Sequence, residues 1–211
     1  MVGSPATCAG VVIVGSLDHN VYALTVTDGA LKWRYQAGGA IYSSAAAADG
    51  VVYFGADDGF VYALDGETGR VRWSFKTGGP VEGAPCVERG VVYIGGTDGC
   101  VYALKAADGT LSWKYRTGGS IRGAPVVAGR YLYVGSEDRH LHVVDLATGR
   151  LLWKARTEGP VASAPVIAGD WLYVGSRDGG LYAFRVSADV AEAPRTVDAG
   201  AGRDGPRSAA R

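Results

Sequence analysis

Two histidines, His140 and His142, are two residues apart, which is a spacing that suggests metal chemistry. Residues two apart in a β-strand point to the same face, so both imidazoles could contact one metal ion. The sequence shows no third ligand near them, and the remaining histidine, His19, is distant in the chain. We therefore interpret all three as surface or packing residues and predict no metal site.

The three cysteines, Cys8, Cys86 and Cys100, have no CxxC or other metal-ligand spacing. Because their number is odd, at least one thiol is free unless it pairs between chains. Cysteine is among the residue types most often buried. We expect small buried residues in strands, and the cysteines do not decide the cellular compartment.

Aspartates and tryptophans recur at a fixed interval of forty residues, which argues against catalysis by either type. The aspartates are Asp18, Asp58, Asp98, Asp138 and Asp178. The tryptophans are Trp33, Trp73, Trp113 and Trp153. A residue needed once in an active site has no reason to recur in every repeat. We interpret the aspartates as turn residues and the tryptophans as packing residues, and we predict no catalytic residue.

The same interval organises the glycines, and repeats of this length are typical of solenoids and propellers. One column holds Gly15, Gly55, Gly95, Gly135 and Gly175, and a second, interpreted as structural turns, holds Gly29, Gly69, Gly109 and Gly149. Paired glycines precede no predicted helix, so they are not phosphate loops. These pairs are Gly38-Gly39, Gly78-Gly79 and Gly118-Gly119.

One repeat predicts four short antiparallel strands, at residues 124–128, 131–136, 141–145 and 151–157. These runs are rich in β-branched and aromatic residues, and Asp-Gly or Thr-Gly turns separate the later ones. No room is left for a helix. Each repeat is therefore a small antiparallel meander.

Side-chain size grows from the first to the fourth strand of each repeat. First strands carry Ala, Ser and Gly, and the middle strands are apolar on both faces, so both faces must be covered. In the fourth strand we expect Leu31, Trp33 and Tyr35 to point inward, with Lys32 and Arg34 outward. Such wedges stack around an axis, which predicts an all-β fold of the β-propeller type with four-stranded antiparallel blades.

The segment Ala63-x-Asp65-x-x-Thr68-Gly69-x-x-x-Trp73 resembles the tryptophan-docking motif of the quinoprotein-type, or PQQ-like, propeller repeat family. The resemblance extends over residues 3 to 186. None of the four recurring tryptophans precedes an aspartate, which distinguishes these repeats from WD40 repeats. The other copies depart from the motif at Lys105, at Val143, and at Thr25 and Asp28.

The resemblance implies one of two branches. Quinoprotein alcohol dehydrogenases hold pyrroloquinoline quinone on the axis with calcium, an adjacent-cysteine disulfide and a catalytic aspartate. The other branch, which is BamB-like or resembles kinase sensor domains, binds no cofactor. No two cysteines are adjacent here, so we expect a non-catalytic interaction scaffold or sensor without a cofactor. The alternatives are a fragment of a quinoprotein dehydrogenase, or a structural spacer in a larger protein such as a bacterial serine/threonine kinase.

The repeats divide residues 3–186 into four complete blades and part of a fifth. The blades cover approximately residues 3–40, 41–80, 81–120, 121–160 and, for the partial blade, 161–186. The tryptophan column would next fall at Ala193, so we expect no fourth strand in the fifth blade. Residues 187–211 have almost no large apolar side chain and are predicted to be disordered. We favour an open arc over a small five-bladed ring.

The 211 residues include 21 basic and 21 acidic side chains, which indicates no nucleic-acid partner. The N-terminus lacks a signal peptide's basic region, and no segment approaches the roughly 20 apolar residues of a membrane span. We expect a cytoplasmic protein as given, or an extracytoplasmic one as part of a longer chain. The expected partner is a protein or peptide, with self-association through the end blades as a further expectation.

Overall fold

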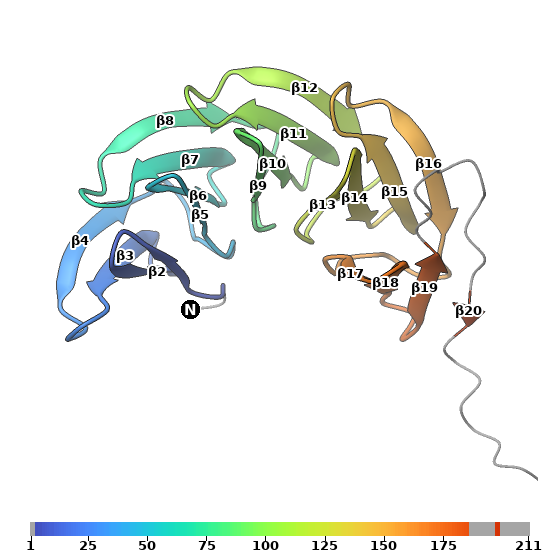
Figure 1. Ribbon diagram of the computed structural model, residues 1–211, viewed down its shortest axis with the longest axis horizontal. Helices are drawn as coiled ribbons and strands as arrows, with labels where there is room; N and C mark the ends of the chain where they lie inside the picture. The colour runs from blue at the N-terminus through green and yellow to red at the C-terminus, as the bar shows by residue number, and fades with distance from the viewer. Residues whose placement is uncertain (1–2, 186–196, 199–211) are drawn as a thin grey trace, which may run out of the picture.

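The computed structural model describes residues 3–185 and Val197–Asp198, and within them the regular elements are all β-strands. Five four-stranded antiparallel sheets follow one another, each with its strands in chain order. Figure 1 shows these sheets as the blades of an open arc, with first strands on the inner side and fourth strands on the outer side. No helix of the described residues is long and apolar enough to cross a membrane.

The strand bounds repeat almost without change. The first blade contains β1 (Ala6–Cys8), β2 (Val11–Gly15), β3 (Asn20–Thr25) and β4 (Leu31–Gln36); the second contains β5 (Ala46–Ala48), β6 (Val51–Gly55), β7 (Phe60–Asp65) and β8 (Val71–Lys76). The third contains β9 (Cys86–Glu88), β10 (Val91–Gly95), β11 (Cys100–Lys105) and β12 (Leu111–Arg116). The fourth contains β13 (Val126–Ala128), β14 (Tyr131–Ser136), β15 (His140–Asp145) and β16 (Leu151–Arg156); the fifth contains β17 (Val166–Ala168), β18 (Trp171–Gly175), β19 (Leu181–Arg185) and β20 (Val197–Asp198).

A β-bulge interrupts the pairing of the third and fourth strands in the first four blades. In the first blade Ala23 pairs with Trp33, whereas Leu24 pairs with Leu31. Because Ala23 and Leu24 point to opposite faces, the bulge turns Leu31 away from the face of Trp33. The side chain of Leu31 is 57% exposed. The expectation that it points inward was wrong, because simple alternation assumes an unbroken strand.

Backbone segments approach each other closely on the inner side of the arc. A Cβ atom placed on Gly123 would lie 2.4 Å from the carbonyl oxygen of Ser163 in the next blade, and one placed on Gly3 would lie 2.7 Å from that of Ser43. Side chains of any size have no room there. This closeness explains why small residues gather at the start of each repeat.

The burial of the middle strands reports how many neighbours each blade has. In β7 of the second blade, the four residues from Val61 to Leu64 are all buried. In β18 of the fifth blade burial alternates, with Leu172 and Val174 buried and Trp171 and Tyr173 only partly so. The second blade is thus covered on two faces and the fifth blade on one. The arc is open between the first and fifth blades, as expected (Figure 1).

The fifth blade differs from the expectation that it has no fourth strand. Val197 and Asp198 form β20, which pairs with Ala183 and Tyr182 of β19. An unpaired strand edge offers free N–H and C=O groups to any extended segment, even one without large apolar residues. Composition therefore could not reveal this pairing. The predicted disorder of the rest of residues 187–211 falls outside the described residues.

Tryptophans of the fourth strands connect each blade to the next. The indole N–H donates a hydrogen bond to a carbonyl 33 residues ahead: Trp33 to Gly66 at 3.0 Å, Trp73 to Ala106 at 2.8 Å and Trp113 to Leu146 at 3.1 Å. The corresponding acceptor for Trp153 would be residue 186, which lies outside the described residues. The hydrogen bond explains the choice of tryptophan, because phenylalanine has no donor.

Each of these indole rings also lies against a glycine of the next blade. A Cβ atom on Gly69, Gly109 or Gly149 would stand 2.7, 2.7 or 2.6 Å from the ring of Trp33, Trp73 or Trp113, respectively. These glycines have φ between 71° and 74°, which side-chain-bearing residues rarely adopt. Gly29 of the first blade has the same conformation, with φ of 72°, but nothing lies within 4 Å of its Cβ position.

Gly109→Ala should therefore destabilise the protein more than Gly29→Ala. Both changes place alanine in a left-handed conformation, which costs roughly 1–2 kcal/mol. Only the change at Gly109 also forces a methyl group against Trp73, and overpacking costs about 1–3 kcal/mol more. Urea unfolding followed by circular dichroism measures both free energies. Equal losses of unfolding free energy in the two variants would show that a methyl group at residue 109 does not clash with the indole ring of Trp73.

Trp73→Ala should lower the free energy of unfolding by ~3–5 kcal/mol, because it removes a buried aromatic side chain and leaves a cavity. Trp171 starts the second strand of the fifth blade and is only partly buried. Trp171→Ala should therefore cost less in the same urea titration. Similar losses at the two positions would argue against the docking role of the recurring tryptophans.

Candidate functional site

The recurring aspartates connect two blades as well as closing a turn. The Oδ1 atom of Asp58 accepts the Phe60 N–H at 2.9 Å, which closes the turn between β6 and β7. Its Oδ2 atom accepts the Tyr62 hydroxyl at 2.6 Å and the Gly38 N–H at 2.8 Å. Gly38 lies in the connection that leaves the first blade. One carboxylate thus holds a turn, a strand and the neighbouring blade's connection together.

Tyrosine is the partner that the sequence analysis missed. A tyrosine hydroxyl four residues after the aspartate donates to its carboxylate in four copies: Tyr22 to Asp18, Tyr62 to Asp58, Tyr102 to Asp98 and Tyr182 to Asp178. The Asp-x-x-x-Tyr spacing was visible and could have revealed it. The hydrogen bond from Tyr22 lowers the pKa of Asp18 below its usual range. Burial, followed by the bond to Asp58, raises the pKa of Tyr62.

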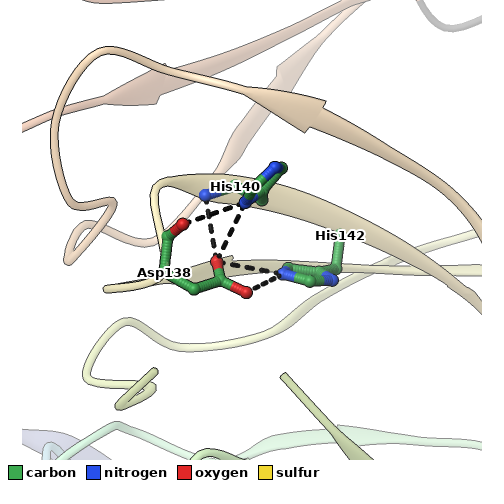
Figure 2. A group of neighbouring side chains, drawn as sticks. All are labelled: Asp138, His140 and His142. Atoms are coloured by element: carbon green, nitrogen blue, oxygen red, sulfur yellow. Dashed lines mark hydrogen bonds and ion pairs between the residues drawn. The ribbon is translucent and has the colours of Figure 1, made fainter. Parts of the chain in front are cut away.

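The fourth copy replaces this tyrosine with His142 and brings His140 to the same aspartate, Asp138 (Figure 2). His142 Nε2 lies 3.0 Å from Asp138 Oδ2, and His140 Nδ1 lies 3.5 Å from Oδ1. One potential ligand atom from each residue lies within 4.8 Å of the other two. The expectation that no third ligand lies near the histidines was therefore wrong. Asp138 had been interpreted only as a turn residue, so it was not considered as a ligand beside the two histidines.

The surroundings of this cluster shift the pKa values of His142 and Asp138. Its side chain is almost fully buried, and its Nδ1 lies 2.9 Å from the hydroxyl of Tyr115 in the third blade. Burial lowers the pKa of His142, although the hydrogen bond to Asp138 opposes the shift. Burial would raise the pKa of Asp138, but hydrogen bonds from the Gly118 N–H and from His142 help to lower it. Burial thus favours the neutral form of the imidazole, and the hydrogen bonds favour the ionised form of the carboxylate.

A separate cleft of about 890 Å³ lies between the third and fourth blades. Its lining includes the aromatic side chains of Tyr93 and Trp113 and the exposed Leu152. Three arginines contribute to the same lining: Arg89, Arg130 and Arg150. The cleft thus combines apolar surface with guanidinium groups.

The acids near these arginines leave an excess of positive charge. Asp145 is the one carboxylate of the lining and pairs with Arg130 at 3.0 Å. Arg89 pairs outside the lining with the adjacent Glu88 at 3.4 Å. Among the described residues, no ion pair is found for Arg150. A negatively charged group can therefore meet an arginine that is not already paired.

The arginine lining is specific to this pair of blades. Between the second and third blades the equivalent positions hold Asp49, Gly90 and Thr110, and between the first and second they hold Ala9, Gly50 and Arg70. The cleft was not predicted from the sequence, because each arginine alone occupies a turn position whose residue type varies between repeats. Reading the turn columns for charge across two consecutive repeats could have found it.

A family model described as outer membrane protein assembly factor BamB matches residues 18–122 and 117–191. The chain belongs to this family. Its repeats are thus PQQ-like repeats, as the resemblance implied. Comparison with curated proteins finds no significant match.

Solved structures with the same fold include both branches of the resemblance. BamB from Moraxella catarrhalis is 24% identical with a TM-score of 0.79, and the match covers 92% of this chain and 59% of that one. The quinohemoprotein alcohol dehydrogenase ADHIIG from Pseudomonas putida HK5 is 22% identical with a TM-score of 0.75, covering 87% and 40%. The computationally designed Ika8 protein is 21% identical with a TM-score of 0.76, covering 86% and 57%.

These likenesses establish the fold alone. The BamB-family chain spans 59% of the Moraxella catarrhalis BamB chain and 40% of the alcohol dehydrogenase chain. Any function therefore has to be argued from the side chains of this chain.

Proposed function

We propose that the chain is a non-catalytic protein-interaction scaffold, and that the cleft between its third and fourth blades binds an acidic peptide segment of a partner. The observation that carries this proposal is the combination of three arginines with aromatic and aliphatic side chains in one cleft. The matching family is that of an outer membrane protein assembly factor, which supports a scaffold.

The chemistry of the cleft favours a peptide with both acidic and apolar side chains. Guanidinium groups bind carboxylates in a bidentate manner, which gives direction as well as strength. Trp113 and Leu152 offer apolar contact area, and tryptophan and arginine are the residues that most often dominate binding energy at protein interfaces. An acidic or aromatic side chain of a partner would thus find a complementary group here.

The alternative of a quinoprotein dehydrogenase fragment fits the residues poorly. The resemblance implies an adjacent-cysteine disulfide beside the quinone, but the three cysteines are free and none is adjacent to another. Cys8 lies in the first blade, and Cys86 and Cys100 lie in two different strands of the third. Adding the quinone and Ca²⁺ should therefore produce neither a visible-band shift nor dye reduction. Tight stoichiometric quinone binding would favour the enzyme instead.

Arg150→Glu should weaken peptide binding at least about tenfold, because it replaces an attractive charge with a repulsive one. The probe is a displayed peptide library selected on the immobilised full chain, followed by affinity measurement on the selected peptides. We expect enrichment in Asp and Glu together with aromatic residues. If the chain is purely a structural spacer, the selection should yield no peptide that binds it saturably.

Arg70→Glu is the matched control for this experiment. Arg70 is the equivalent residue in the second blade, and both backbone N–H groups lie 3.4 Å from a threonine hydroxyl, that of Thr68 or Thr148. Arg70 lies outside the cleft, so its reversal should leave binding unchanged. Equal losses from both reversals would indicate nonspecific charge attraction, and no loss from Arg150→Glu would exclude the cleft.

We further propose that the chain self-associates through its end blades. Trp171 and Tyr173 are only partly buried and Leu181 is 51% exposed in the fifth blade. Burying apolar surface is worth on the order of 25 cal/mol per Å². Light scattering at low concentration should therefore detect a dimer or larger particle. A monodisperse monomer that binds no hydrophobic dye would contradict this proposal.

A further inference from the structure

The side chains of Asp138, His140 and His142 have the donor atoms and spacing of a transition-metal site (Figure 2). Zinc binds imidazole nitrogen and carboxylate oxygen at about 2.0–2.2 Å, so neighbouring ligand atoms of a tetrahedral site lie roughly 3.3 Å apart. Measured to the same carboxylate oxygen, Asp138 Oδ1, the separations are 3.2 Å from His142 Nε2 and 3.5 Å from His140 Nδ1, which are close to this value. We propose that these three residues bind one Zn²⁺ ion at the turn between β14 and β15.

The hydrogen bonds around the cluster orient two of the three ligands. The hydroxyl of Tyr115 lies 2.9 Å from His142 Nδ1 and can accept a hydrogen bond from it. When zinc binds, the imidazole proton moves from Nε2 to Nδ1, which leaves the lone pair of Nε2 free for the metal beside the carboxylate. The N–H groups of Gly118 and His140 donate to Asp138 at 2.9 and 3.0 Å and hold the carboxylate in place. Metal-binding histidines commonly use their second nitrogen in this way, and fixed ligands bind more tightly than mobile ones.

His140 is the ligand that has to adjust. Its Nδ1 lies 2.9 Å from the backbone carbonyl of Asp138, so this nitrogen exchanges that contact for the metal. The side chain is 23% exposed, so the ring can turn and an ion can enter from this side. A water molecule from the same side can occupy the fourth position, because the protein supplies three ligands.

The other blades provide an internal comparison. Four copies have a tyrosine at the position of His142, and each donates its hydroxyl to the aspartate. The position of His140 holds unrelated residues in those copies, namely Asn20, Phe60, Cys100 and Gly180. A histidine that only replaced the tyrosine as donor would need no second histidine. Metal binding accounts for both histidines together.

Nearby charges and ligand types define which ion fits. Lys154 and Arg156 of β16 lie opposite His142 and His140 of β15 in the strand register. The side chains of Lys154 and Arg156 are exposed, so solvent screens their charges. Asp138 supplies a negative charge. Two imidazole ligands favour Zn²⁺ over Mg²⁺ and Ca²⁺, which prefer sites made of oxygen ligands.

Isothermal titration calorimetry of the full chain without a histidine tag tests this site, with ZnCl₂ as the titrant. We expect one Zn²⁺ per chain, and at least about tenfold weaker binding for His142→Tyr and for His140→Asn. His142→Tyr restores the tyrosine–aspartate pair of the other four blades, and His140→Asn introduces the residue of the first blade. Both variants should therefore fold, which circular dichroism checks.

His19→Asn is the matched control. His19 belongs to the equivalent turn of the first blade but is not part of the cluster, so its removal should leave zinc affinity unchanged. Three results would overturn the proposal: no zinc binding by the unmodified chain, equal binding by both folded cluster variants, or binding of Mg²⁺ or Ca²⁺ as tight as that of Zn²⁺. A rise in melting temperature with Zn²⁺, lost in His142→Tyr, would support it independently.

Discussion

The contact between a tryptophan and the following blade sets the geometry on which the rest of the molecule depends. The indole ring of Trp73 fills the wide outer space between two sheets and covers a glycine whose missing side chain makes that space available. Its N–H group then fixes the depth of insertion through one carbonyl. A hydrogen bond of this kind contributes only about 1 kcal/mol net. Its larger effect is to give each blade one position relative to the next.

Close backbone contact on the inner side completes the wedge. Glycines such as Gly123 allow neighbouring chains to meet where a side chain would collide. With both ends of the wedge fixed, turns at either end of a strand can vary without changing the fold. The two proposed sites use this freedom at opposite ends of β15, where His140 begins the strand and Asp145 ends it. Both proposals thus place their chemistry on the same frame.

The fold could be predicted from sequence to a large extent because its determinants repeat. Forty-residue columns of Gly, Asp and Trp identified the blades, and apolar middle strands predicted that every blade needs neighbours. The features that were missed depend on relations between strands or blades. A bulge exposes Leu31, and β20 pairs with a free strand edge. Arg150 forms part of a cleft only because residues of the third blade lie beside it. The cluster at Asp138 was missed because a turn role had already been assigned to that residue.

The alternating burial of the end blades has a consequence for cooperativity. In an array where each unit contacts only its neighbours, stability is approximately a sum of local terms, and opening begins at the termini. The first and fifth blades each have one neighbouring blade, so they have the fewest stabilising contacts. Amide hydrogen exchange in such an array slows from the ends toward the centre. The third blade, which contributes Arg89 to the cleft and Tyr115 to the histidine cluster, occupies the most protected place.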